Sequence, residues 1–241
     1  MRKRKKRIPK KSILLLSAAV LLLLGSTIGS TRAALTYYSE NYVAGMELSS
    51  IGVSLLENGK VVSSRDYKGN GEWKGEADGV LLGKFLKEGE KIIPGKNYDE
   101  VLSVRNSGNI DTYVRVIVTT NWLDKEKKKV PVTTLDPGLI ELHYLDGWRV
   151  DDAASTSERT VLYYQDILSA GSEVAFADSL RINPDICNRL TQTVDDNVYT
   201  YTYEYDGYSF QIAAEVDAVQ THNGKDAVKS AWGIDGSILG L

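Results

Sequence analysis

The sequence predicts an all-β protein, a jelly-roll-like β-sandwich preceded by a cleaved N-terminal signal peptide. After residue 33, apolar residues recur with a period of two, and no stretch keeps helical spacing for long. Turn residues separate many short apolar runs, which is the pattern of a sandwich or jelly roll. A cationic run followed by an apolar run at the N-terminus indicates the signal peptide.

Charge is distributed unevenly along the 241 residues, which carry a formal total of −3. Residues 1–33 hold nine basic residues and no acidic one, so the remainder has 20 basic and 32 acidic residues. This acidic remainder excludes a basic nucleic-acid-binding domain, and we expect no nucleic acid partner. The single cysteine, Cys187, excludes an internal disulfide framework and any multi-thiolate metal site.

The first element is an export signal, residues 1–33. A cationic stretch, 1–11, precedes the apolar stretch 12–24, and small residues follow. Thr31 and Ala33 have the spacing of a signal-peptidase site, so we expect cleavage between Ala33 and Ala34. The chain would then contact a membrane only during export. The alternative is an uncleaved anchor, because residues 12–31 are uncharged and about long enough to span a bilayer.

Beyond the signal, residues 34–45 form an N-terminal segment and 46–241 one sandwich domain, since no Pro- or Ser-rich linker interrupts the chain. Apolar runs predict strands at 46–56, 79–86, 139–145, 160–165 and 173–182. Strands 98–106 and 111–122 are predicted to pair, with Gly108 taking a positive φ in the reversal between them. Residues 111–122 are apolar or β-favouring on both faces, as expected of a central strand.

A second hairpin is predicted from 198–205 to 210–216, with Asp206-Gly207 as its turn. Its first strand presents a row of tyrosines, Tyr199, Tyr201, Tyr203 and Tyr205. Such a row is either a stacking platform for sugars or bases, or a half-buried sheet face whose hydroxyls reach water, and the second interpretation is favoured.

Residues that carry chemistry are few, and we predict no catalytic residue, no metal site and no cofactor. His143 and His222 lie outside any zinc-protease pattern, and His143 is interpreted as a surface or edge-strand residue. Cys187 has no histidine near it in sequence, so packing as a small apolar residue is favoured over nucleophilic chemistry. The acid pairs 151–152 and 195–196 lack calcium-loop spacing and are interpreted as solvated loops.

Four motifs occur in order along the chain, and together they are similar to the TasA/camelysin family. They are Ala34-Leu-Thr-Tyr-Tyr-Ser-Glu40 with Asn41-Tyr-Val-Ala-Gly-Met-Glu-Leu48; Ile92-Ile-Pro-Gly95; Val101-Leu-Ser-Val-Arg-Asn-Ser-Gly-Asn109 with its following strand; and Phe210 to Gln220 leading to Ala231-Trp-Gly233. The resemblance covers most of the exported chain. Two departures are Ser-Glu at 39–40, where the family has Ser-Asp, and residues 121–198, which match no part of the pattern.

The resemblance implies a jelly-roll-like sandwich that assembles into extracellular biofilm-matrix fibres by strand donation, the N-terminal segment of one subunit pairing with the sheet of the next. The candidate donor residues are Leu35, Tyr37, Tyr38, Tyr42 and Val43. Implied partners are a SipW-type signal peptidase, further copies of the chain and accessory matrix proteins. The implied location is the cell surface or extracellular matrix of a Gram-positive-type bacterium.

Two other function classes stay open at this point. Camelysin-like relatives are described as cell-surface metallopeptidases, although this chain has two histidines and no zinc motif. A monomeric surface adhesin is the third interpretation, with the tyrosine strand or residues 123–160 as its binding region. We favour the structural protein over the enzyme and the adhesin.

Overall fold

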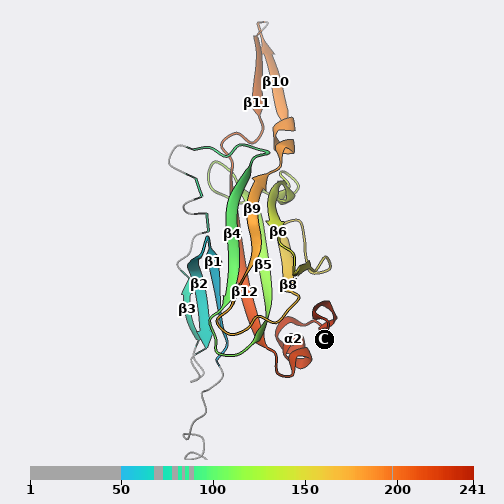
Figure 1. Cartoon of the computed structure of the whole chain (residues 1–241). Helices are drawn as coiled ribbons and strands as arrows, with labels where there is room; N and C mark the ends of the chain where they lie inside the picture. Colours follow the sequence, from blue (N-terminus) through green and yellow to red (C-terminus); the bar gives the residue numbers. More distant parts are fainter. Residues whose placement is uncertain (1–49, 68–72, 78–80, 83–84, 87–89, 197) are drawn as a thin grey trace, which may run out of the picture. The chain divides into compact units, whose positions relative to one another are not determined.

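In the part of the chain that the structure describes, the strands form two antiparallel sheets and a separate hairpin (Figure 1). The computed structural model describes residues 50–67, 73–77, 81–82, 85–86, 90–196 and 198–241. Among these residues, no helix is long and apolar enough to cross a membrane. The predicted signal segment and the donor segment lie outside the described residues.

The wider sheet has six strands in the order β3-β2-β1-β4-β9-β6. They are β3 (Trp73–Ala77), β2 (Lys60–Tyr67), β1 (Gly52–Glu57), β4 (Asn97–Asn106), β9 (Glu173–Ile182) and β6 (Ile140–Tyr144). The narrower sheet, in the order β12-β5-β8-β7, contains β12 (Ser209–Gln220), β5 (Thr112–Leu123), β8 (Arg159–Tyr164) and β7 (Trp148–Val150). The predicted all-β sandwich is confirmed, as are the strands expected at 139–145, 160–165 and 173–182.

The chain passes repeatedly between the two sheets, as in a jelly roll. Four pairs of strands are successive in sequence but lie in different sheets, namely β4 and β5, β5 and β6, β6 and β7, and β8 and β9. Side chains from both sheets meet in one buried core, which includes Leu102, Val104, Val116, Leu162, Phe176 and Ile212. Val130 and Leu135, from the stretch between β5 and β6, belong to the same core.

Strand β5 is buried on both of its faces. Val114, Val116 and Val118 point into the sandwich, while Tyr113 belongs to a second cluster on the other face. That cluster is closed by α2 (Gly224–Trp232) and by the short helix η3 (Ser237–Leu239). The central-strand prediction for 111–122 is therefore confirmed, and helix α2 explains why both faces are apolar.

The predicted pairing of 98–106 with 111–122 is wrong, because β4 and β5 lie in different sheets. β4 pairs with β1 and β9, whereas β5 pairs with β12 and β8. The turn between them is a corner held by the buried side chain of Asn106. Its Nδ2 donates to the carbonyl oxygens of Ile110 at 2.8 Å and Leu168 at 2.9 Å, and its Oδ1 accepts from the Gly108 N–H.

Gly108 serves this corner by its small size, since it is absent from the glycines with positive φ. A Cβ there would lie 2.7 Å from the Gly52 nitrogen and would collide with the Ser50 carbonyl oxygen. The start of β1 therefore packs directly against the corner, and only glycine leaves room for it.

The second predicted hairpin is also wrong. Residues 198–203 form β11 (Val198–Tyr203), which pairs with β10 (Leu190–Asp195), while β12 pairs with β5 over all twelve of its residues. Gly207, with φ of +82°, lies in the connection from β11 to β12. β12 alternates apolar residues with the same phase as β5, so pairing with β5 directs Ile212, Ala214 and Val216 to the core, while Val219 joins Tyr113 on the opposite face.

Two further expectations differ from the structure. The described part of 79–86, residues 81–82 and 85–86, contains turns and bends, and no strand. The strand expected at 46–56 begins at Gly52, and β2 and β3 follow it unpredicted. Both unpredicted strands are rich in charged and small residues, so their sequences lack apolar alternation.

A carboxyl group is buried where β1 meets β4. Glu100 is 1% exposed; its Oε2 accepts from Asn58 Nδ2 at 3.2 Å, and its Oε1 has no hydrogen-bond partner among the described residues. Burial, together with the neighbouring Glu57 carboxyl, raises the pKa of Glu100 from 4.5 to about 7. Glu57 in turn accepts from the Leu82 N–H at 2.5 Å.

We predict that Asn106→Ala lowers the free energy of unfolding by about 2–4 kcal/mol, because it leaves buried carbonyl groups without donors. Urea denaturation measures this. The control is Asn188→Ala, which removes an exposed asparagine bonded to Asp185. Equal losses in the two variants would contradict the role of the corner.

We predict that Glu100→Gln changes how stability depends on pH. A pKa of about 7, raised from 4.5, makes the wild type lose stability as the pH rises from about 4.5 to 7, because the unfolded state ionises first. The neutral glutamine lacks this loss, so the variant should be more stable than wild type by about 2–3 kcal/mol at about pH 8 and similar below about pH 4.5.

Urea midpoints across this pH range test the prediction, with exposed Glu215→Gln as the matched control. A variant whose stability follows the wild type in parallel at every pH would contradict it.

Candidate interaction site

The β10–β11 hairpin is a two-stranded ribbon that pairs with no other described strand (Figure 1). Its register places Leu190 opposite Tyr203, Gln192 opposite Tyr201, and Val194 opposite Tyr199. Since opposed residues point to the same face, these six side chains form one uncharged face of the ribbon, which we call the tyrosine face.

The tyrosine face is open to solvent. Tyr199, Tyr201 and Tyr203 are 61%, 60% and 53% exposed, and every residue of both strands is exposed. The favoured expectation of a half-buried row is therefore wrong for these three tyrosines. Nothing in the described part of the chain packs over them, which makes the tyrosine face the prominent unpartnered surface of the described residues.

The root of the hairpin is bonded to the sandwich through Tyr205. Its hydroxyl donates to the Thr134 carbonyl oxygen at 2.8 Å and accepts from Arg189 Nη1 at 2.8 Å. The Glu204 N–H also donates to the Arg189 carbonyl oxygen, which continues the pairing of the two strands toward the root. These bonds hold the hairpin where it leaves the wider sheet.

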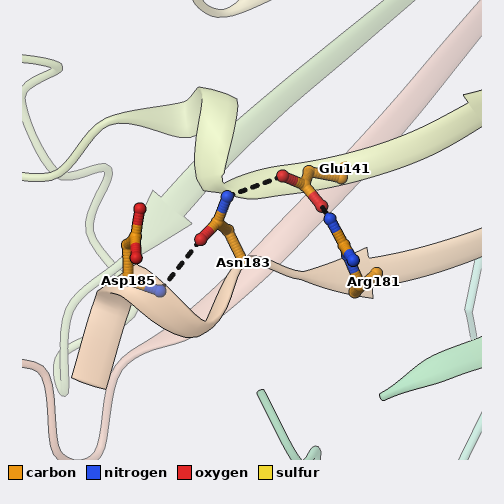
Figure 2. Close-up of polar contacts among 4 residues, drawn as sticks. All are labelled: Glu141, Arg181, Asn183 and Asp185. Carbon is orange, nitrogen blue, oxygen red and sulfur yellow. Dashed lines mark hydrogen bonds and ion pairs between the residues drawn. The ribbon is translucent and has the colours of Figure 1, made fainter. Parts of the chain in front are cut away.

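A polar cluster holds the chain just before β10 (Figure 2). Glu141 on β6 accepts from Arg181 on β9 at 2.6 Å and from Asn183 Nδ2 at 2.7 Å. Asn183 then caps the short helix η2 (Pro184–Asn188) by accepting from the Asp185 N–H at 2.9 Å. This chain of contacts connects the edge of the wider sheet to the helix that leads into the hairpin.

An apolar groove of about 680 Å³ lies at the hairpin root. Its aromatic lining consists of Trp122, Tyr203, Tyr205, Tyr208 and Phe210. Because Tyr203 belongs to both surfaces, the tyrosine face and the groove are continuous. This arrangement suits binding of a neutral or apolar surface.

Free strand edges are the second feature of interest. The four ends of the sheets are β3 and β6 in the wider sheet and β12 and β7 in the narrower one. β12 is the longest of these, with twelve residues against three to five for the others. No described strand pairs with its outer edge, so its outward N–H and C=O groups form a template for strand addition.

The sheets also differ in width at this side. β12 packs against β1, yet the wider sheet continues for two more strands beyond β1. Among the described residues, no strand of the narrower sheet faces β2 and β3. An added strand beside β12 would complete the narrower layer opposite β2.

The residues singled out for chemistry lie apart from one another. His143, on the edge strand β6, contacts Asp178 at 2.9 Å and is exposed, as expected, and this hydrogen bond lowers the pKa of Asp178. Cys187 is an exposed free thiol, so the expected packing is wrong: η2 places it on the surface. In the described ranges, no group of three or more His, Cys, Asp or Glu side chains is arranged to hold a metal ion.

The two acid pairs, 151–152 and 195–196, lie at turns. Asp151 Oδ1 accepts from the N–H groups of Ala153 and Ala154, and Asp195 and Asp196 lie at the tip of the hairpin. The predicted cleavage and donor residues, Thr31 to Val43, lie outside the described residues.

No protein-family model matches the chain, and no curated protein and no solved structure shows significant similarity to it.

We predict that Tyr205→Phe loosens the hairpin without unfolding the sandwich. Loss of the bonds to Thr134 and Arg189 is worth about 1 kcal/mol, so hydrogen exchange of the β10 and β11 amides should quicken about fivefold. Exchange in β5 should be unchanged. Tyr201→Phe, which alters only an exposed hydroxyl, is the control; an equal effect in that variant would refute the anchoring role.

Proposed function

We propose that this chain is a secreted structural protein of the cell surface or biofilm matrix, which assembles into extracellular fibres by strand donation. The donor is the segment 35–43, and the acceptor is the outer edge of β12. The observation that carries the proposal is this twelve-residue edge, together with the narrower sheet that ends there.

The acceptor edge has the properties that strand addition requires. β12 is held along its whole length by β5, so it is ordered before any partner arrives. Phe210, Ala214 and Val216 point toward the core but are only partly buried. A strand laid beside β12 would satisfy its outward backbone groups and cover these side chains further.

The donor segment matches this edge in length and composition. Leu35 to Val43 has nine residues, of which three are tyrosine, and it contains no proline or glycine. Cleavage after Ala33 would place it at the new N-terminus. Donation from each subunit to the next is a head-to-tail contact that does not close, so it produces a filament.

Charge supports a soluble precursor. The chain after residue 33 has 20 basic and 32 acidic residues, so subunits repel one another until a specific pairing forms. Export by a SipW-type signal peptidase and contact with accessory matrix proteins belong to the same proposal.

We predict that the paired substitution Tyr37→Pro with Tyr38→Pro abolishes fibres. Consecutive residues of a strand direct their N–H groups to opposite sides, so one of the two prolines must remove a bond to the acceptor. The melting temperature of the sandwich should be unchanged. Electron microscopy of the exported protein measures fibre formation.

The matched control is Tyr37→Thr with Tyr38→Thr, which keeps both N–H groups and should retain fibres. Undiminished fibres in the proline variant would remove the donor hypothesis. Particles that stay monomeric in the wild type would remove the fibre proposal and favour the adhesin.

A further inference from the structure

We propose that the β10–β11 hairpin is a self-association surface, through which two copies of this chain pair β11 edge to β11 edge in antiparallel orientation. The contact uses a different surface from the β12 edge. It therefore holds whether or not the N-terminal segment donates a strand.

The first support is that both hairpin strands have open edges that nothing in their sequence protects. Within the described residues, β10 and β11 pair only with each other. Residues 190–194 and 198–203 contain no charged residue, no proline and no glycine. Proteins usually protect such edges with lysine, proline or bulges, and short uncharged β-favouring segments are the sequences that pair with copies of themselves.

The second support is the exposed tyrosine face. A two-stranded ribbon alone in water is marginally stable, and three or more strands are needed for independent stability. Pairing two β11 edges makes a four-stranded sheet with all six tyrosines of the two copies on one face. Cross-strand aromatic pairs then stabilise it. β11 is the strand that carries the tyrosines, so its edge brings them together, whereas the β10 edge would not.

The third support is charge, which selects the antiparallel orientation. The tip carries Asp195 and Asp196, and no basic residue lies in 190–196. The root carries the cations Arg189, Lys125 packed against Gly207, and Lys127 bonded to Ser209, interspersed with the anions Glu204, Asp206, Asp124 and Glu126. Antiparallel pairing sets each acidic tip beside the root of the partner, where these cations lie, and away from the partner's acidic tip. Parallel pairing would set tip against tip.

Single-cysteine cross-linking tests this geometry in the full chain with Cys187→Ser as background. In an antiparallel pair, each residue of one β11 lies directly opposite a residue of the other β11. When both tyrosine faces point to the same side, the opposed residues lie on the same face of the sheet. One position of β11 therefore lies opposite the same position in the second copy. A disulfide needs Cα atoms about 4.4–6.8 Å apart, which only that residue satisfies. Each position from Tyr199 to Thr202 is replaced by cysteine, one at a time, and oxidised under mild conditions.

The expected result is a covalent dimer that peaks sharply at one position of β11. Thr191→Cys and Thr193→Cys on β10 are the matched controls and should give none. Asp195→Lys with Asp196→Lys should reduce the dimer several-fold, because the lysines at the tip would then lie beside Arg189, Lys125 and Lys127 of the partner's root. No dimer at any position, equal dimer at all positions, or dimer only through β10 would each overturn the proposal. Fibres seen without hairpin cross-links would leave strand donation standing and remove this interface alone.

Discussion

Burial of β5 on both faces is the constraint around which the described part of the molecule is arranged. Val114, Val116 and Val118 require an opposing sheet, and Tyr113 on the other face requires the cover that α2 supplies. Arg115 lies on the covered face, where it pairs with Asp217 of β12 at 2.5 Å and stacks over Trp232 of α2 at 5.2 Å. The partner strand, the helix and the core thus depend on one central strand.

Strand type could be predicted well from the sequence where apolar alternation was strong, as in β5, β6, β8 and β9. Strand pairing could not. The Asn106 corner and the Asp206-Gly207 connection both contain turn residues, but a local turn signal does not distinguish a hairpin from a crossing between sheets. Whether a turn forms a hairpin or a crossing depends on residues far away in the sequence. The corner is bonded to Leu168, and β12 pairs with β5. β10 lacked an apolar alternation altogether, so it was missed.

The tyrosine row itself was visible in the sequence, but its exposure was not. Exposure depends on what else folds over a strand, and in the described residues neither sheet extends to this ribbon. Likewise, the β12 edge is identified as a site for strand addition by the unequal widths of the two sheets, which depend on strand order and are not visible in the sequence. The carboxyl of Glu100 is buried in phase with Leu102 and Val104 of β4, a position where apolar alternation leads one to expect an apolar residue.

The place of β1 in the wider sheet has a mechanical consequence for any filament built from this domain. β1 is the first strand of the described chain and is hydrogen-bonded on both sides, to β2 and to β4. Tension that enters at Ser50 acts along the strand and loads both ladders in shear, so their bonds share the force. A strand at a sheet edge pulled in the same direction would have only one ladder to carry the force.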